Sequence, residues 1–172
     1  MGNLRGAMVT FGCSAWGYSA AGDLSVESDK VDVGPSAILG AGTGDGQADL
    51  MYHRRVAITA GQVHTYTFSG SALTDVFGDS LNLVKIKALY VRNVGASATG
   101  GKIRVAGTNG VVGLGIDVRP GEASMKACAA GQGDNDATCY PVSAGSTDVI
   151  TVTNTDGSLA TTYEIVVIGT SA

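Results

Sequence analysis

Along most of this chain, short runs of alternating apolar and polar residues are each closed by a turn signal. Residues 63–68 alternate small polar with larger side chains, and residues 147–154 alternate in the same way. A period of two predicts β-strands with one face buried. Similar runs occupy residues 55–59, 83–92, 102–105, 111–118, 123–127 and 163–168. Together, these runs predict eight or nine strands.

Two of these runs indicate how the strands are covered. Residues 163–168 are apolar on both faces, which predicts a central strand buried on both sides. In residues 83–92, Lys85 and Lys87 alternate with apolar neighbours before the run becomes apolar throughout. We therefore expect this strand to begin with one polar face and to end fully covered.

The turn signals predict the local connections. Residues 60–61 and 155–158 each separate two strand patterns, and we expect each of them to close a hairpin. Residues 119–122 form a Pro-Gly turn pattern that leads into the next strand. Residues 75–77 are the one stretch that favours a helical turn.

The strand pattern predicts an all-β protein whose body, residues 47–172, is an antiparallel β-sandwich. Eight strands favour a jelly roll, with an immunoglobulin-like sandwich as the second choice. Residues 1–46 lack a sustained period and read as an extended, Gly-rich, acidic arm, in which residues 40–46 serve as a hinge. The arm's candidate residues for contact with a partner are apolar or aromatic: Met8, Val9, Phe11, Trp16 and Tyr18.

Composition supports this fold class and narrows the set of partners. The 172 residues include 26 Gly but few Glu, Lys and Gln, which disfavours a helical bundle. The first fifty residues carry the whole net charge of −4, and the remainder is balanced. Because neither part carries an excess of basic side chains that could neutralise phosphates, we expect no nucleic-acid partner. No apolar run has the length of a membrane span or signal peptide, so we expect no membrane partner and folding in the cytoplasm.

Residues with reactive side chains form no recognisable catalytic motif. His53 and His64 lack the local sequence of a Ser-His-Asp site, so we expect ordinary strand histidines. Cys13, Cys128 and Cys139 lack the CxxC spacing of a zinc or redox site. Cys128 and Cys139 flank a turn-rich stretch and remain open to two readings, a disulfide or a pair of buried free thiols.

Two glycine-rich loops are candidate ligand sites. Residues 40–46 lack the strand, helix and lysine of a phosphate-binding loop. Residues 131–136 offer closely spaced oxygen atoms, but they depart from the EF-hand spacing and favour an acidic loop tip. We therefore expect no catalytic residue, no metal and no cofactor.

Several ordered blocks between residues 44 and 172 resemble one family. They are 44–49 (GDGQAD), 54–58 (RRVAI), 73–78 (LTDVFG), 84–93 (VKIKALYVRN), 118–122 (VRPGE), 140–148 (YPVSAGSTD), 152–154 (VTN) and 163–171 (YEIVVIGTS). In these blocks the chain resembles small structural proteins of tailed-bacteriophage virions. Residues 1–43 and the stretch from Cys128 to Cys139 depart from the pattern.

The resemblance implies a virion protein without enzymatic activity. It suggests a capsid decoration, or cement, protein that sits on the head surface as a homotrimer and binds the major capsid protein. The apolar faces of the last two strands also favour a homo-oligomer. The alternatives are a tail or baseplate component, and a carbohydrate-binding β-sandwich in which Trp16 and Tyr18 stack on sugar rings.

Overall fold

The computed structural model describes residues 6–10, 13–18, 28–33, 36–96, 99–106, 115–127 and 140–171, with side chains from Leu39 onward. All regular secondary structure in these ranges is β-strand. No helix there is long and apolar enough to cross a membrane. The strands are β1 (Gly6–Thr10), β2 (Cys13–Tyr18), β3 (Ser28–Val33), β4 (Ser36–Ala41), β5 (Gln47–Ala48), β6 (Leu50–Ile58), β7 (Val63–Thr67), β8 (Leu73–Thr74), β9 (Ser80–Leu81), β10 (Lys85–Asn93), β11 (Ile103–Ala106), β12 (Ile116–Val118), β13 (Ala123–Ala127), β14 (Tyr140–Pro141), β15 (Val149–Asn154) and β16 (Thr161–Thr170).

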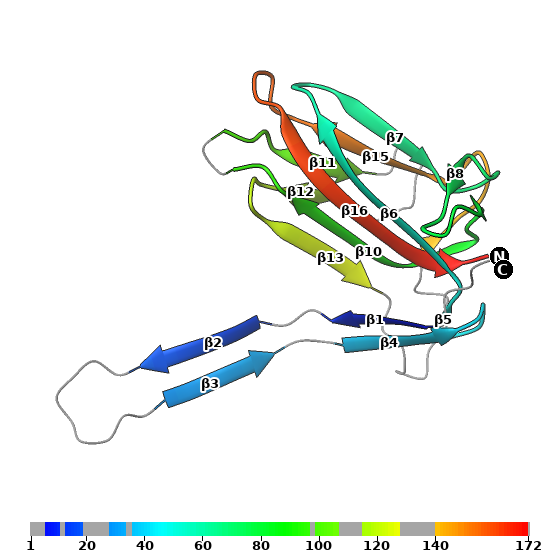
Figure 1. Ribbon diagram of the computed structural model, residues 1–172, viewed down its shortest axis with the longest axis horizontal. Coiled ribbons are helices and arrows are strands. Elements are labelled where there is room, and N and C mark those ends of the chain that lie inside the picture. Colours follow the sequence, from blue (N-terminus) through cyan, green and yellow to red (C-terminus); the bar gives the residue numbers. More distant parts are fainter. Residues whose placement is uncertain are drawn as a thin grey trace.

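Two antiparallel sheets face each other and form the body (Figure 1). Sheet I has the order β13-β10-β16-β6, with β14 paired to the start of β10, and sheet II has the order β12-β11-β15-β7. Both sheets contribute fully buried side chains to the core between them, such as Leu89 and Ile165 from sheet I and Ile103 and Ile150 from sheet II. The predicted all-β antiparallel sandwich is confirmed.

Strand β16 is the centre of sheet I, as its sequence predicted. It pairs with β10 on one side and with β6 on the other. Tyr163, Ile165 and Val167 belong to the main core, whereas Ile168 belongs to a smaller cluster on the opposite face of the sheet. Both faces of this strand are therefore covered at its C-terminal end.

The two predicted hairpins are wrong. Strand β6 pairs with β16 and β7 pairs with β15, so the turns after β6 and after β15 both carry the chain from one sheet to the other. The backbone N–H of Gly61 in the first turn donates to the carbonyl of Asp156 in the second, at 2.8 Å. Turns do occur at these residues, but a short turn can carry the chain between two sheets as well as close a hairpin.

Two further local expectations fail. The register of β10 against β16 shifts between Ile86 and Ala88, and this irregularity leaves Lys87 buried, with 1% of its surface exposed, where alternation predicted a polar face. Residues 75–77 form no helical turn. The Asp75 carboxylate instead accepts hydrogen bonds from the backbone N–H groups of Phe77 (2.8 Å) and Asp79 (2.9 Å), which closes a loop between β8 and β9.

The arm contains a β-ladder, although its sequence lacks a sustained period. Strand β1 pairs with β4 from Gly6↔Gly40 to Thr10↔Ser36, and β2 pairs with β3 from Cys13↔Val33 to Tyr18↔Ser28. Both pairs are antiparallel, and they belong to two separate sheets. Figure 1 shows this ladder projecting from the body.

The predicted hinge at residues 40–46 is a hydrogen-bonded loop. The N–H of Gly40 donates to the carbonyl of Gly46 at 2.8 Å, and the N–H of Gly44 donates to the side-chain oxygen of Gln47 at 2.9 Å. After this loop, β5 pairs with β4 in parallel. The loop thus turns the end of the arm back toward the first strand of the body.

We predict that Gly169→Ala destabilises the body. A Cβ at this position would collide with the carbonyl oxygen of Lys85 and lie 3.0 Å from a methyl group of Leu83. Overpacking of this kind costs about 1–3 kcal/mol in free energy of unfolding, which chemical denaturation measures. Gly157→Ala is the control, because a Cβ there meets nothing within 4 Å. Equal stability of the two variants would contradict the packing described for β16.

Candidate interaction surfaces

The strand registers arrange the outer face of sheet I in three rows. The first row is apolar, the second contains one histidine, and the third is charged. In the order β13, β10, β16, β6, they are Ala127, Ala88, Ile168, Met51; then Met125, Tyr90, Val166, His53; then Ala123, Arg92, Glu164, Arg55. The face thus changes from apolar to charged along the strands.

The base of the arm covers the middle of the first row, at Ala88 and Ile168. Leu39 of β4 and Ala48 of β5 form a buried cluster with Ala88 and Ile168, and Met51 packs against its side. Leu39 is only 3% exposed. Burying a leucine side chain contributes about 1.5–3 kcal/mol, so this contact stabilises the attachment of the arm to the body.

This cluster removes part of the apolar surface that favoured an oligomer. From its sequence, the second apolar face of the last strand favours cover by a neighbouring subunit. In the structure, Leu39 and Ala48 of the same chain cover the Ile168 end of that face. Met125, Tyr90 and Val166 in the second row keep part of their surface exposed. Any further cover for this face has to come from beyond the base of the arm.

The charged third row is linked to the second row by a hydrogen bond. The His53 Nε2 atom lies 2.8 Å from Glu164 Oε1, and the two side chains are 44% and 27% exposed. Arg55 and Arg92 are the register partners of Glu164 on either side. Exposed pairs contribute little to stability, so this row acts mainly as a charged border to the apolar rows.

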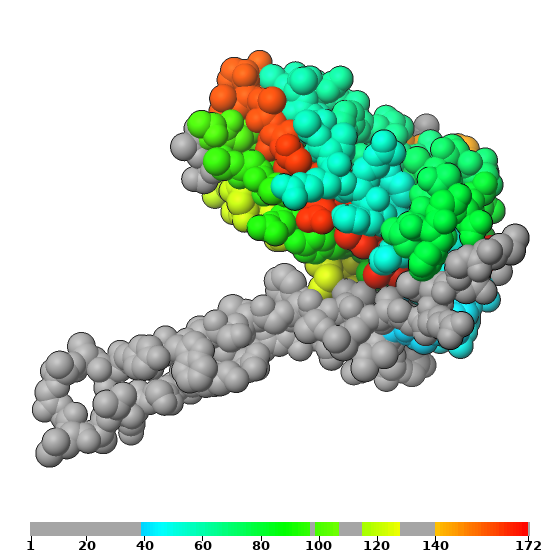
Figure 2. All heavy atoms as spheres, in the orientation of Figure 1, coloured from blue at the N-terminus to red at the C-terminus, as the bar shows by residue number. Residues whose placement is uncertain are grey.

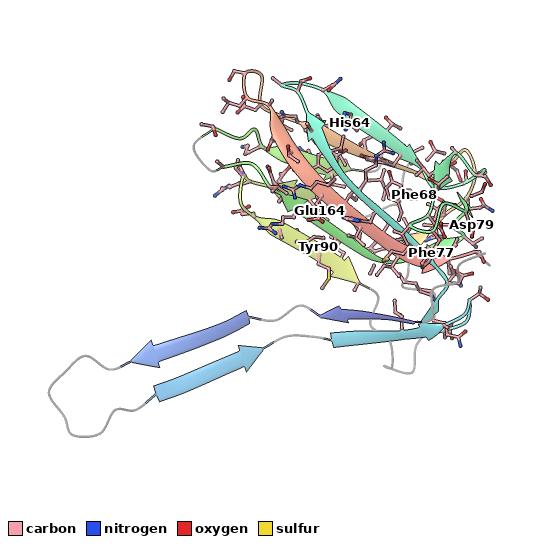
Figure 3. The ribbon with its side chains drawn as sticks, in the orientation of Figure 1. His64, Phe68, Phe77, Asp79, Tyr90 and Glu164 are labelled. Carbon is pink, nitrogen blue, oxygen red and sulfur yellow. The ribbon has the colours of Figure 1, made fainter. Side chains whose placement is uncertain are left out.

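A second exposed feature is the loop between β8 and β9. Val76 and Phe77 are 39% and 52% exposed at its tip, and the Val76 N–H donates to the carbonyl of Met51 at 3.1 Å. Figure 2 shows this loop on the surface of the body, and Figure 3 shows Phe77 and Asp79 at the end opposite His64. The tip of this loop thus exposes two apolar side chains, Val76 and Phe77, to solvent.

A polar groove of about 460 Å³ lies over sheet II. Arg104 and Asp117 face each other across β11 and β12 with 3.8 Å between Nε and Oδ1, and both side chains are well exposed. The lining has no aromatic side chain on which a sugar ring could stack. Its residues are Lys102, Arg104, Asp117, Arg119, Glu122 and Thr155.

His64 takes part in a hydroxyl network at one end of the core. Its Nδ1 atom lies 2.9 Å from the hydroxyl of Tyr163, which also hydrogen-bonds to the hydroxyl of Tyr66. Burial raises the pKa of both tyrosines above the usual value, so both stay protonated and neutral. The network satisfies polar groups inside the sandwich and presents no reactive anion.

Only some of the residues chosen from the sequence fall within the described part. Met8 and Val9 lie on β1, and Trp16 and Tyr18 lie on β2. Phe11, Cys128 and Cys139 lie outside the described residues. The disulfide therefore stays a prediction, as do the proposed contacts of the arm.

Sequence reasoning missed the second apolar cluster and the groove. Each gathers side chains from strands distant in sequence, and only the pairing of strands brings them together. No group of three or more His, Cys, Asp and Glu that could hold a metal occurs among the described residues.

Comparison with known proteins provides no family. No protein-family model matches the chain, and a search of curated proteins returns no relative. The function proposed below depends on the geometry of the body and the arm.

We predict that Tyr163→Phe and Tyr52→Phe have different effects on stability. Tyr163→Phe removes a hydroxyl that bonds both His64 and Tyr66, and should cost about 1–3 kcal/mol in free energy of unfolding. Tyr52 packs edge-on against Tyr66 and Phe68, and its buried hydroxyl lies near the Arg54 side chain without a hydrogen bond of normal geometry. Tyr52→Phe should therefore be neutral or stabilising. Urea denaturation of both variants measures the difference, and a larger loss for Tyr52→Phe would refute the assignment.

Proposed function

We propose that this protein is a non-enzymatic structural protein of a tailed-bacteriophage virion, a decoration protein that binds the major capsid protein on the outer head surface. The observation that carries the proposal is the β-ladder arm, which projects from a packed sandwich (Figure 1). A two-stranded ribbon is at best marginally stable alone in water. An arm of this shape suits a protein that is held against neighbouring surfaces in an assembly.

The order of the strands supports the same proposal. Numbered along the chain, the eight main strands β6, β7, β10, β11, β12, β13, β15 and β16 give the orders 6-3-8-1 in sheet I and 5-4-7-2 in sheet II. We infer from this order a jelly-roll winding. Viral capsid domains, lectins and cupins share that architecture, so it agrees with a virion role without specifying it.

The alternatives have less support from the described surfaces. The carbohydrate-binding alternative depends on stacking by Trp16 and Tyr18, which lie on β2, and the groove over sheet II adds no aromatic side chain to it. A tail or baseplate component shares every feature of the proposed role except its place in the particle. Finding the protein in isolated tails rather than on heads would favour that alternative.

We predict that shortening the arm weakens binding to phage heads. Thr10 and Ser36 are register partners, so a two-residue Asn-Gly turn in place of residues 11–35 should close a short hairpin and keep Leu39 on the body. Loss of even one buried apolar side chain from the contact corresponds to about tenfold weaker binding. Cosedimentation with heads that lack the protein measures this.

The control for the shortened arm is the full chain in the same assay, with far-UV circular dichroism to show that both bodies are folded. Equal retention of the two proteins on the heads would exclude the arm from head binding. Absence of binding by the full chain would overturn the decoration role itself.

A further inference from the structure

The outer edge of β6 carries backbone groups that no described strand pairs with. Strand β6 lies at the end of sheet I, where β16 is its neighbour. The even-numbered residues of β16 bond to β10, a register that the bond from the Val94 N–H to the Thr162 carbonyl continues. The odd-numbered residues of β16 therefore bond to β6, where their register partners are even-numbered. It follows that the odd-numbered residues of β6 direct their N–H and C=O groups to the open edge.

A loop of the same chain marks where this open edge begins. The Val76 N–H donates to the carbonyl of Met51 at 3.1 Å, which agrees with the outward direction of the odd-numbered residues. Farther along β6, the backbone groups of His53, Arg55 and Ala57 have no partner in the part of the chain that the structure describes. Figure 1 shows β6 lying beside β16 on the body. An unpaired edge of this length is a template for the addition of another strand.

The side chains along this edge are basic. Arg54 and Arg55 are exposed, and His53 is 44% exposed. The chain as a whole has fifteen acidic and eleven basic side chains, so this stretch differs in sign from the rest of the protein. Two copies of β6 paired through this stretch would bring arginines close to arginines, which is unfavourable. Its charge instead complements a foreign strand with acidic side chains.

An exposed apolar pair lies at the Met51 end of the same edge. Val76 and Phe77 are 39% and 52% exposed, and the Asp75 carboxylate holds their loop by accepting from the backbone N–H groups of Phe77 and Asp79. Figure 3 shows Phe77 at the end of the body where β6 begins. Basic side chains alone could serve only to keep an edge from aggregating, but an exposed apolar pair beside them would oppose that purpose. The two features together fit a strand that is acidic and ends in an apolar residue.

We propose that the outer edge of β6 is a docking site for an extended acidic segment of a partner protein. The segment adds to sheet I as an antiparallel strand, like every other pairing in that sheet, and rests an apolar residue on Val76 and Phe77. Backbone hydrogen bonds supply affinity, and carboxylates opposite His53 and Arg55 set the register. The inference goes beyond the proposed function, because it concerns an edge of the body rather than the arm.

Binding of a designed peptide to the full-length chain tests the proposal. The probe is the blocked, dye-labelled peptide TTEVEVETL, whose alternate glutamates share one face and whose leucine falls opposite Met51 when the central glutamate lies opposite Arg55. Fluorescence anisotropy should show saturable binding that weakens as salt is added. The control peptide has lysine in place of each glutamate and should not bind.

N-methylated peptides test whether the partner adds as a strand. In an antiparallel pair, the residues opposite the odd positions of β6 direct their own N–H groups to it, and in this peptide those residues are the glutamates. Methylating the glutamate nitrogens should weaken binding at least about tenfold. Methylating the nitrogens of the residues between the glutamates alters only the far edge of the peptide and should leave the affinity unchanged.

Variants of the protein test the two ends of the site. Arg55→Gln should weaken peptide binding about two- to fivefold, whereas Arg104→Gln on the outer side of sheet II should have no effect. Phe77→Ser should weaken binding about tenfold. Leu159→Ser is its control, because Leu159 is also exposed, at 37%, but lies in the turn after β15. Far-UV circular dichroism shows that each variant is folded.

Three results would overturn the proposal: no binding of the acidic peptide at millimolar concentration, equal binding of the lysine peptide, or equal effects of the two methylation patterns. An oligomer in light scattering that Arg55→Gln strengthens would also overturn it, because a second copy of β6 would then be the occupant. Head binding is measured separately with the shortened arm, which keeps β6 unchanged. Failure of either experiment therefore leaves the other result standing.

Discussion

Burial of both faces of β16 is the constraint on which the rest of the structure depends. Tyr163, Ile165 and Val167 need sheet II on one side, and Ile168 needs cover on the other. Sheet II satisfies the first requirement through two crossing turns that are tied to each other by a hydrogen bond. The base of the arm satisfies the second. The attachment of the arm is thus part of how the body buries its central strand.

Buried polar groups fix the loops at the crossing end of the sandwich. The Asn93 side chain donates to the carbonyls of Gly101 and Val118 and accepts from Thr161. The Asn154 side chain donates to the carbonyls of Thr59 and Leu159. Satisfied polar groups of this kind specify one arrangement of loops, since any other would leave them without partners. A rigid end of this kind suits a protein whose surfaces must match those of its neighbours.

The base of the arm and the outer face of sheet I share one buried apolar cluster. Of the candidate contact residues chosen from the sequence, Met8 and Val9 lie on β1, and Trp16 and Tyr18 lie on β2. Apolar character alone did not single out Leu39 and Ala48 as the residues that cover sheet I, because that contact depends on strand pairing between distant parts of the chain.

The sequence by itself determined the all-β class, most strand positions, the central place of β16 and the absence of a basic field, because alternation and composition are local properties. It failed where the outcome depended on distant strands: the turns after β6 and β15 cross between sheets, and Lys87 is buried at a register shift. The tertiary structure alone decided the apolar rows, the groove and the contact of Leu39. A turn sequence constrains the chain within a few residues, but pairing partners are set by which apolar faces can be buried together.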